Sequence, residues 1–406
     1  MKRLLVLVSV LLAAARAEWV SIGPDGGNVQ AMAVNPRDAA ELLAVAYEYP
    51  DSGRVFRSSD SGAHWDAVGR FADISCGKLV IDPHTDTVAY GLGGSANICR
   101  STDDGATWTS RDLPNQAFDF VCDPHVAGRL FAVGYWVSGT YWPAVFISTD
   151  RGQTWITRYP DPGAIQRYAT SVACDPVNPG VLYVGTTDSI VYRSTNGGES
   201  WERRNSGLPA NAGVMSLSVN PVNPSIILAG AGDGMYRSTD AGMSWSPVQD
   251  LRRACDIKFA SGALAYALAY DTLMRIFFSV DSGRTWQASL PGMVLGKGEA
   301  IHTVPGSPDG LYLNGAMGVF RSTDRGNTWN AAHGGMRFAH VSTIAACPGH
   351  AERLYLEVYE NGVFKSSDGG QTWTRCADFL ACGNICAIGA TPYTYADLLY
   401  ALEGSG

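Results

Sequence analysis

Short apolar runs with alternating polar positions recur along the whole chain. Between residues 215 and 219, methionine, leucine and valine alternate with two serines, which is the period of a strand with one buried face. An Asn-Pro turn ends this run. The segments SIILAG and GMYRS follow, each short and bounded by glycine, aspartate or proline. The pattern predicts a β-protein of many short strands joined by tight turns.

A nine-residue motif, RSTDRGNTW at 321–329, recurs eight times with small changes. Successive copies lie 41 to 47 residues apart, a spacing typical of a propeller blade or of a pair of helices. The strand periodicity inside each unit favours the blade, so each unit is expected to hold four strands. The tryptophans that end the motif are Trp65, Trp108, Trp155, Trp201, Trp245, Trp286, Trp329 and Trp373.

The motif lies between the third predicted strand and the fourth, which opens with the tryptophan. Its acidic residue is expected to accept hydrogen bonds from backbone N–H groups of the turn, and the glycine two places later to supply a positive φ. The tryptophan is expected to fill the gap between neighbouring sheets. The sequence therefore predicts a stabilising motif and not a binding one. The polar residues concerned are Asp60, Asp103, Asp150, Asn196, Asp240, Asp281, Asp324 and Asp368.

Copies such as RSSDSGAHW, RSTDRGNTW and KSSDGGQTW resemble the Asp-box, or bacterial neuraminidase, repeat, and they span nearly the whole predicted mature chain. Proteins with this repeat include sialidases, xyloglucanases, sortilin-type receptors and photosystem II assembly factors. The resemblance implies a β-propeller. Because the repeat occurs in enzymes and in pure binding proteins, it implies a fold and leaves the activity open.

The two ends of the chain carry further signals. Residues 1–17 have a basic start, an apolar run and an Ala-x-Ala end, which predicts a secretory signal peptide cleaved near Ala17. The propeller is then expected over 18–406, as eight complete Asp-box repeats plus a partial closing blade. In that blade the strand opened by Trp19 joins two C-terminal strands. An open sheet edge would otherwise remain, so we also expect the native chain to continue past Gly406.

Charge and composition narrow the classes of partner. The formal net charge is −8, and removal of the three basic residues of the signal peptide makes it −11. Such an acidic chain disfavours nucleic acid and anionic membrane surfaces. No later apolar run approaches the roughly 20 residues of a membrane span. We expect a secreted or cell-envelope protein without a transmembrane segment.

Nine cysteines in an exported chain leave at least one without a partner inside the chain. Cys376, Cys382 and Cys386 are close enough in sequence for one local bridge. No CxxC pair and no HExxH spacing occurs, so the sequence predicts neither a metal site nor a cofactor.

One interpretation of the function is a glycoside hydrolase. The Arg-Ile-Pro segment of sialidases is absent, and the Asp-Ile-Gly-Gly context of xyloglucanases is replaced here by AYEYPDSG. Glycoside hydrolysis needs two carboxylates across a cleft. Acids predicted in loops after second strands are Glu48, Asp51, Asp271, Glu357 and Glu360.

The main interpretation is a non-catalytic protein that binds a protein or glycan partner. Loops that join second to third strands lie on the face opposite the Asp-box turns, and aromatic side chains there suit a sugar ring or a peptide. The insertion GYWVSGTYWPAVF is the strongest such feature, with Trp136 and Trp142 as expected anchors. The alternative is that these rings cover the ends of neighbouring blades. The candidate binding residues are Tyr47, Tyr49, Trp136, Tyr141, Trp142, Tyr270 and Tyr359.

Overall fold

A computed structural model gives the fold of most of the chain. It describes residues 28–48, 52–73, 75–94, 96–137, 140–163, 167–210, 212–248, 251–270, 274–289, 300–315, 318–332, 341–347, 350–358, 362–368, 372–375, 385–390 and 399–403.

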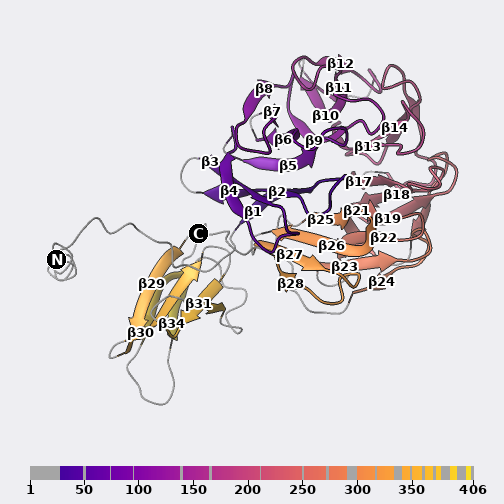
Figure 1. Ribbon diagram of the computed structural model, residues 1–406. Helices are drawn as coiled ribbons and strands as arrows, with labels where there is room; N and C mark the ends of the chain where they lie inside the picture. Colours follow the sequence, from indigo (N-terminus) through magenta and orange to yellow (C-terminus); the bar gives the residue numbers. More distant parts are fainter. Residues whose placement is uncertain are drawn as a thin grey trace. The chain divides into compact units, whose positions relative to one another are not determined.

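The described residues form strands and turns and divide into two compact units. The larger unit covers Asp25–His340, and the smaller one contains Val341–Glu357 and Gly362–Gly406. The larger unit holds seven four-stranded antiparallel sheets (Figure 1). Their strands are β1 (Val29–Val34), β2 (Leu42–Glu48), β3 (Ser52–Ser58) and β4 (Asp66–Arg70); β5 (Cys76–Ile81), β6 (Ala89–Gly93), β7 (Asn97–Ser101) and β8 (Thr109–Asp112); β9 (Ala117–Cys122), β10 (Leu130–Val137), β11 (Tyr141–Ser148) and β12 (Ile156–Arg158); β13 (Ala169–Cys174), β14 (Leu182–Thr186), β15 (Val191–Ser194) and β16 (Glu202–Arg203); β17 (Val214–Val219), β18 (Ile227–Ala231), β19 (Gly234–Ser238) and β20 (Ser246–Val248); β21 (Arg252–Phe259), β22 (Ala265–Tyr270), β23 (Met274–Ser279) and β24 (Gln287–Ala288); and β25 (Ala300–Val304), β26 (Ser307–Gly315), β27 (Gly318–Ser322) and β28 (Asn330–Ala331).

The smaller unit contains one further sheet and a strand pair. The sheet consists of β29 (Val341–Cys347), β30 (His350–Val358), β31 (Gly362–Ser366) and β32 (Thr374–Arg375), with the eighth Asp box between its last two strands. The pair consists of β33 (Ile385–Ala390) and β34 (Leu399–Glu403).

The seven sheets of the larger unit are the blades of a closed propeller, because the seventh blade packs on the first. Three hydrogen bonds cross this junction. Asn314 donates to the carbonyl of Val29 at 2.9 Å, the Tyr312 hydroxyl to Ser61 at 3.0 Å, and the Trp65 indole to Ala332 at 2.7 Å.

The expectation of eight complete blades plus a partial one is therefore wrong, because the ring closes after seven. A count of repeats does not reveal where a ring closes, and the eighth motif falls in the smaller unit. β33 and β34 do not take part in the ring of seven. The strand expected at Trp19 lies outside the described residues.

The hydrophobic core of the propeller consists of seven clusters, one in each gap between neighbouring blades. The Asp-box tryptophan of every blade packs into the cluster shared with the preceding blade. Trp108 of the second blade, for example, packs beside Leu43 and Val55 of the first. The blades share no backbone sheet hydrogen bonds, so this apolar packing provides most of the adhesion between them.

The Asp box is a hydrogen-bonded turn in which serine and aspartate cooperate. In the seventh blade the Asp324 carboxylate accepts from the backbone N–H and the hydroxyl of Thr328, at 2.8 and 2.6 Å. The Ser322 hydroxyl donates to Asp324 and accepts from the N–H of Gly326 at 2.9 Å. Asn196 accepts from Ser200 N–H in the same way, at 3.0 Å. The hydrogen bonds hold the pKa of Asp324 below its ordinary value.

Two successive residues of the turn take left-handed conformations, where the sequence suggested one. Gly326 has φ of 82°, and Arg325 before it has φ of 63°. A non-glycine residue pays a conformational cost there, and the bonds of the box offset it. The carboxylate and the serine together explain why both recur in the motif.

Removal of the box carboxylate or its tryptophan should destabilise the propeller. Asp324→Ala deletes three accepted bonds and should lower the free energy of unfolding by about 1–3 kcal/mol. Trp329→Ala empties part of the gap to the sixth blade and should cost about 3–5 kcal/mol. Urea unfolding measures both. Thr323→Ala, at an exposed box residue, is the matched control and should leave stability within about 0.5 kcal/mol. Equal losses in all three variants would contradict the assigned roles.

Candidate functional site: the face opposite the Asp boxes and the axial cavity

The ends of the β2–β3 type hairpins share one face with the connections between blades. In the third blade this hairpin is extended, and Trp136 pairs with Trp142 while Val137 pairs with Tyr141. Alternate residues of a strand point to opposite sides. Tyr135 and Tyr141 therefore lie on one side of the hairpin and the two tryptophans on the other.

Four aromatic rings meet on this face, between the third and fourth blades. Tyr135 touches Tyr141, Tyr168 and Phe118, with ring centroids 5.2, 5.0 and 5.8 Å apart. Tyr168 also contacts Tyr141 at 5.4 Å and Phe118 at 6.1 Å. Phe118 and Tyr141 remain 47% and 40% exposed, so an apolar surface faces solvent. These four residues are called the aromatic cluster below.

Tyr141 is the member of the aromatic cluster that the sequence singled out. Phe118, Tyr135 and Tyr168 were missed, because Phe118 and Tyr168 come from other segments of the chain. Tyr135 belongs to the insertion already quoted. The period-2 pattern of the hairpin would have grouped it with Tyr141 and apart from Trp136.

The two expected anchors lie in a different environment. Trp136 is half-buried and packs against the cluster between the second and third blades, and Trp142 is also half-buried. Tyr47 is exposed at the end of β2. Tyr49 and Tyr359 lie outside the described residues. Tyr270 ends β22, but its side chain falls outside the description.

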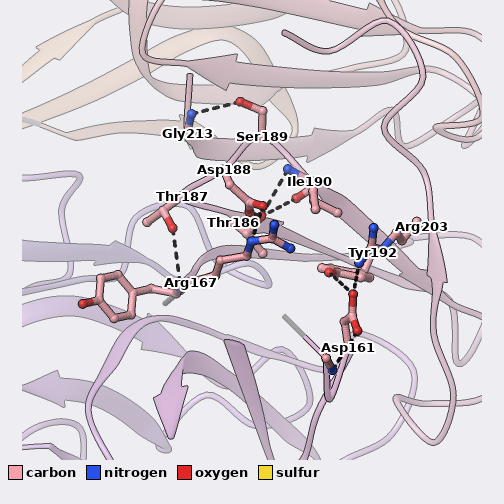
Figure 2. A network of polar contacts seen from close by, with 12 residues as sticks. Asp161, Arg167, Thr186, Thr187, Asp188, Ser189, Ile190, Tyr192, Arg203 and Gly213 are labelled. Carbon is pink, nitrogen blue, oxygen red and sulfur yellow. Dashed lines mark hydrogen bonds and ion pairs between the residues drawn. The ribbon is translucent and has the colours of Figure 1, made fainter. Parts of the chain in front are cut away.

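A polar network supports the aromatic cluster from the fourth blade (Figure 2). Arg167 forms an ion pair with Asp188 at 2.6 Å, and the Thr186 hydroxyl donates to the same carboxylate. The backbone N–H of Tyr168 donates to Thr187 Oγ1 at 3.2 Å, which holds the backbone of Tyr168 next to this pair. Side chains held in this way present a fixed surface to a ligand.

Asp161, in the connection from the third to the fourth blade, is a structural acid. It accepts from Arg203, from the Tyr192 hydroxyl at 3.2 Å and from Gly163 N–H at 3.0 Å (Figure 2). The Arg203 hydrogen bond is the main reason why the pKa of Asp161 lies below its ordinary value. Burial raises the pKa of Tyr192 to about 12, so this hydroxyl remains a donor. An acid of lowered pKa is unsuited to protonating a leaving group.

A cavity of about 780 Å³ lies on the axis, lined by the first strands of all seven blades. It is called the axial cavity below. Hydrogen bonds cross every junction between neighbouring blades around it, six of them between first strands and the last from Asn314 of β26 to β1. In ring order they join Gln30 to Cys76, Lys78 to Asp119, Asp119 to Val172, Thr170 to Val214, Ser216 to Ile257, Asp256 to Ile301 and Asn314 to Val29.

Two lysines, two aspartates and a histidine line this cavity, together with three cysteines. Lys78 pairs with Asp119 at 2.5 Å and Lys258 with Asp256 at 2.7 Å. Burial disfavours the charged forms of both Lys258 and Asp256, but the attraction between the two charges outweighs this effect. The pKa of Asp256 is lowered and that of Lys258 is raised. His302 contacts Asn314 Oδ1 at 2.7 Å, and burial lowers the pKa of His302.

The cysteines whose side chains the structure describes are free thiols, namely Cys76, Cys99, Cys122, Cys174 and Cys255. Of Cys347 only the backbone is described. Within that part no group of three or more potential ligands gathers to hold a metal ion. The described residues also contain no helix able to cross a membrane. Cys376 and Cys382 lie outside the described residues, and of Cys386 the structure gives only the backbone, so the expected local bridge is untested.

Comparison with known proteins points to one enzyme class. A family model described as sortilin, neurotensin receptor 3 matches residues 143–261. A xyloglucanase from Hypocrea jecorina is 26% identical over 320 residues, 67% of this chain and 33% of that protein. Xyloglucanase Xgh74A of Acetivibrio thermocellus is 32% identical over 96 residues, 20% of this chain and 11% of that protein.

The solved structures support the fold. The GH74 xyloglucanase from Xanthomonas campestris superposes with a TM-score of 0.65 at 16% identity, over 90% of this chain and 70% of that one. YCF48 from Cyanidioschyzon merolae gives 0.53 at 14% identity, over 75% of this chain and 98% of that one. The chain is a β-propeller similar to xyloglucanases.

These findings confirm the resemblance drawn from the Asp boxes and overturn the expected function. The main interpretation as a non-catalytic binding protein is wrong, and so is the preference for a protein without enzymatic activity over the alternative glycosidase. Curated relatives of this xyloglucanase-like propeller are glycoside hydrolases, which fits the alternative interpretation. The missing Asp-Ile-Gly-Gly segment was a misleading argument against a hydrolase. Its absence excludes a catalytic carboxylate at that one position, but it does not exclude glycoside hydrolysis. The chain spans about a third of the length of the first of these relatives.

Protonation of His302 should weaken the propeller at acid pH. Its pKa is lower in the folded state than the ordinary value of 6.5, so the folded state resists protonation. The contribution of neutral His302 to the free energy of unfolding should be fully present above pH 6.5 and should decline as the pH falls below 6.5. His302→Gln keeps a donor for Asn314 and removes the titration. Urea unfolding at pH 8 and pH 5 should show a smaller loss in the variant than in the wild type. Equal losses in both proteins would contradict this role.

Proposed function

We propose that the chain belongs to an exported glycoside hydrolase that cleaves a xyloglucan-like β-glucan. The reaction class is supported by the curated xyloglucanases, one of which aligns with 67% of the chain. The observation that carries the proposal within the structure is the exposed aromatic cluster. Its rings lie on the face of the propeller where blade connections gather, opposite the Asp boxes.

An aromatic surface of this kind suits a sugar chain. The apolar faces of glucose-type rings stack on aromatic side chains, which give a large contact area at low entropic cost. Phe118 and Tyr141 are the exposed members, while Tyr135 and Tyr168 hold them from behind. The adjacent Arg167–Asp188 pair offers polar groups for hydroxyl recognition. A few polar groups beside an apolar platform are typical of ligand sites.

Catalytic carboxylates need an environment different from that of Asp161 and Asp188, the two acids described on this face. Asp161 and Asp188 are each neutralised by an arginine, so neither suits a general acid. The candidates remain the acids of the sequence analysis. Asp51, Asp271 and Glu360 lie outside the described residues, and of Glu48 and Glu357 the structure gives only the backbone. We propose that the glycan lies along the aromatic cluster.

Incubation with polysaccharide tests the reaction. The mature chain should release reducing ends from xyloglucan and much less from carboxymethylcellulose. Single substitutions Glu48→Gln, Asp51→Asn, Asp271→Asn, Glu357→Gln and Glu360→Gln should include at least one that lowers the rate by about 10²–10⁴-fold. Chromatography of the products measures release. Absence of release from every β-glucan offered, by a folded protein, would refute the proposal.

Substitutions in the third blade test where the glycan binds. Tyr141→Ala removes an exposed ring and should weaken xyloglucan binding about thirtyfold, or about 2 kcal/mol, with little change in melting temperature. Trp136→Ala is the matched control from the opposite side of the hairpin. It should lower stability by about 3 kcal/mol and leave affinity almost unchanged. The reverse pattern would show that the tryptophan side of the hairpin carries the ligand.

A further inference from the structure

Each oxygen of the two carboxylates in the axial cavity already accepts a hydrogen bond. Asp119 accepts from Lys78 through one oxygen and from Val172 N–H through the other. Asp256 likewise accepts from Lys258 and from the N–H of Ile301. Both carboxylates are therefore satisfied by the protein itself.

Several hydrogen-bond donors in the same cavity have N–H groups without a partner among the described residues. An ammonium group has three N–H bonds, and Lys78 and Lys258 each use one on a carboxylate among the described residues. Gln30 accepts from Cys76 N–H through its oxygen, which leaves its amide N–H groups without a partner in the described part of the chain. His302 uses Nε2 on Asn314, so Nδ1 gains a free N–H on protonation. The surplus of donors favours a ligand rich in acceptor oxygens.

These donors come from four consecutive blades of the ring. Lys258 is on the sixth blade, His302 on the seventh, Gln30 on the first and Lys78 on the second. All four residues line the axial cavity, so they share one solvent-filled space. The two lysine side chains are 33% and 40% exposed, so solutes that enter the cavity can reach them.

We propose that the axial cavity binds a small oxyanion of the carboxylate, sulfate or phosphate class through Lys78, Lys258, Gln30 and His302. The ligand would complete the hydrogen bonds that the protein leaves open. Phe118 of the aromatic cluster also lines this cavity, but the four residues proposed to bind the anion do not belong to that cluster. The proposal does not depend on the proposed hydrolase activity.

The charge balance sets the pH dependence of binding. The groups that face His302 are Lys78, Lys258 and Asp256, with Asp119 paired to Lys78. Two ion pairs leave the cluster neutral while His302 is neutral, and protonation of His302 makes it positive. An oxyanion therefore binds more tightly at pH 5.5 than at pH 8, and its binding stabilises the protonated ring.

Titration with inorganic phosphate and sulfate tests the site. Calorimetry of the mature chain at pH 5.5 and 8, with chloride at equal ionic strength as the reference, should show saturable binding of both oxyanions. Sulfate, whose charge is the same at both pH values, should bind more tightly at pH 5.5 and is the probe for the pH dependence. Lys258→Gln should weaken binding at least about tenfold, because a charge-assisted hydrogen bond is lost. Lys365→Gln, in the smaller unit, should keep the wild-type affinity. If Lys258→Gln fails to fold, Lys78→Gln replaces it with the same expected loss.

Two results would overturn the proposal. One is an absence of saturable phosphate or sulfate binding by the folded wild type at pH 5.5. The other is wild-type affinity in a folded variant that lacks Lys258 or Lys78. Neither result bears on xyloglucan cleavage, which is measured separately. His302→Gln should abolish the pH dependence while it retains binding at pH 8.

Discussion

The junction between neighbouring blades is the constraint on which the larger unit depends. Each blade is a complete sheet whose backbone bonds stay within it, so nothing in the strand ladders links one blade to the next. Apolar clusters fill the seven gaps, and side-chain bonds around the axis fix the first strands relative to one another. Loss of any one junction opens the ring, because a closed propeller has no terminal blade that can tolerate an exposed side.

The two faces of the propeller therefore have different structural roles. On one face the Asp boxes hold tight turns and aim a tryptophan at the preceding blade. On the opposite face the hairpin ends differ from blade to blade, from the tight turn at Thr186–Ile190 to the long extension after Tyr135. Because the packing between blades and the Asp-box turns hold the propeller together, the hairpin ends are free to vary. A binding surface is expected at these ends.

The sequence predicted the strand order, the place of every described box between third and fourth strands, and the propeller class, because these depend on local periodicity and turn chemistry. Blade number was not predictable in this way. Closure depends on contacts such as Asn314 with Val29, which are 285 residues apart. The aromatic cluster was only partly predictable for the same reason. Tyr141 belongs to a conspicuous insertion, whereas Phe118 and Tyr168 reach it only once two blades are docked. The axial aspartates were not identified, since Asp119 and Asp256 stand in unremarkable strand positions.

Each Asp-box tryptophan packs against the preceding blade, and this order has a consequence for synthesis on the ribosome. From the second blade to the seventh, each tryptophan finds its gap in a blade that has already left the exit tunnel. Trp65 is the exception, since its partner Ala332 is made 267 residues later. At translation rates of about 5–20 residues per second, this interval lasts roughly 10–50 s. During that time the first blade carries a bare apolar flank, so the nascent chain passes through a stage at which a chaperone or a neighbouring chain can engage it.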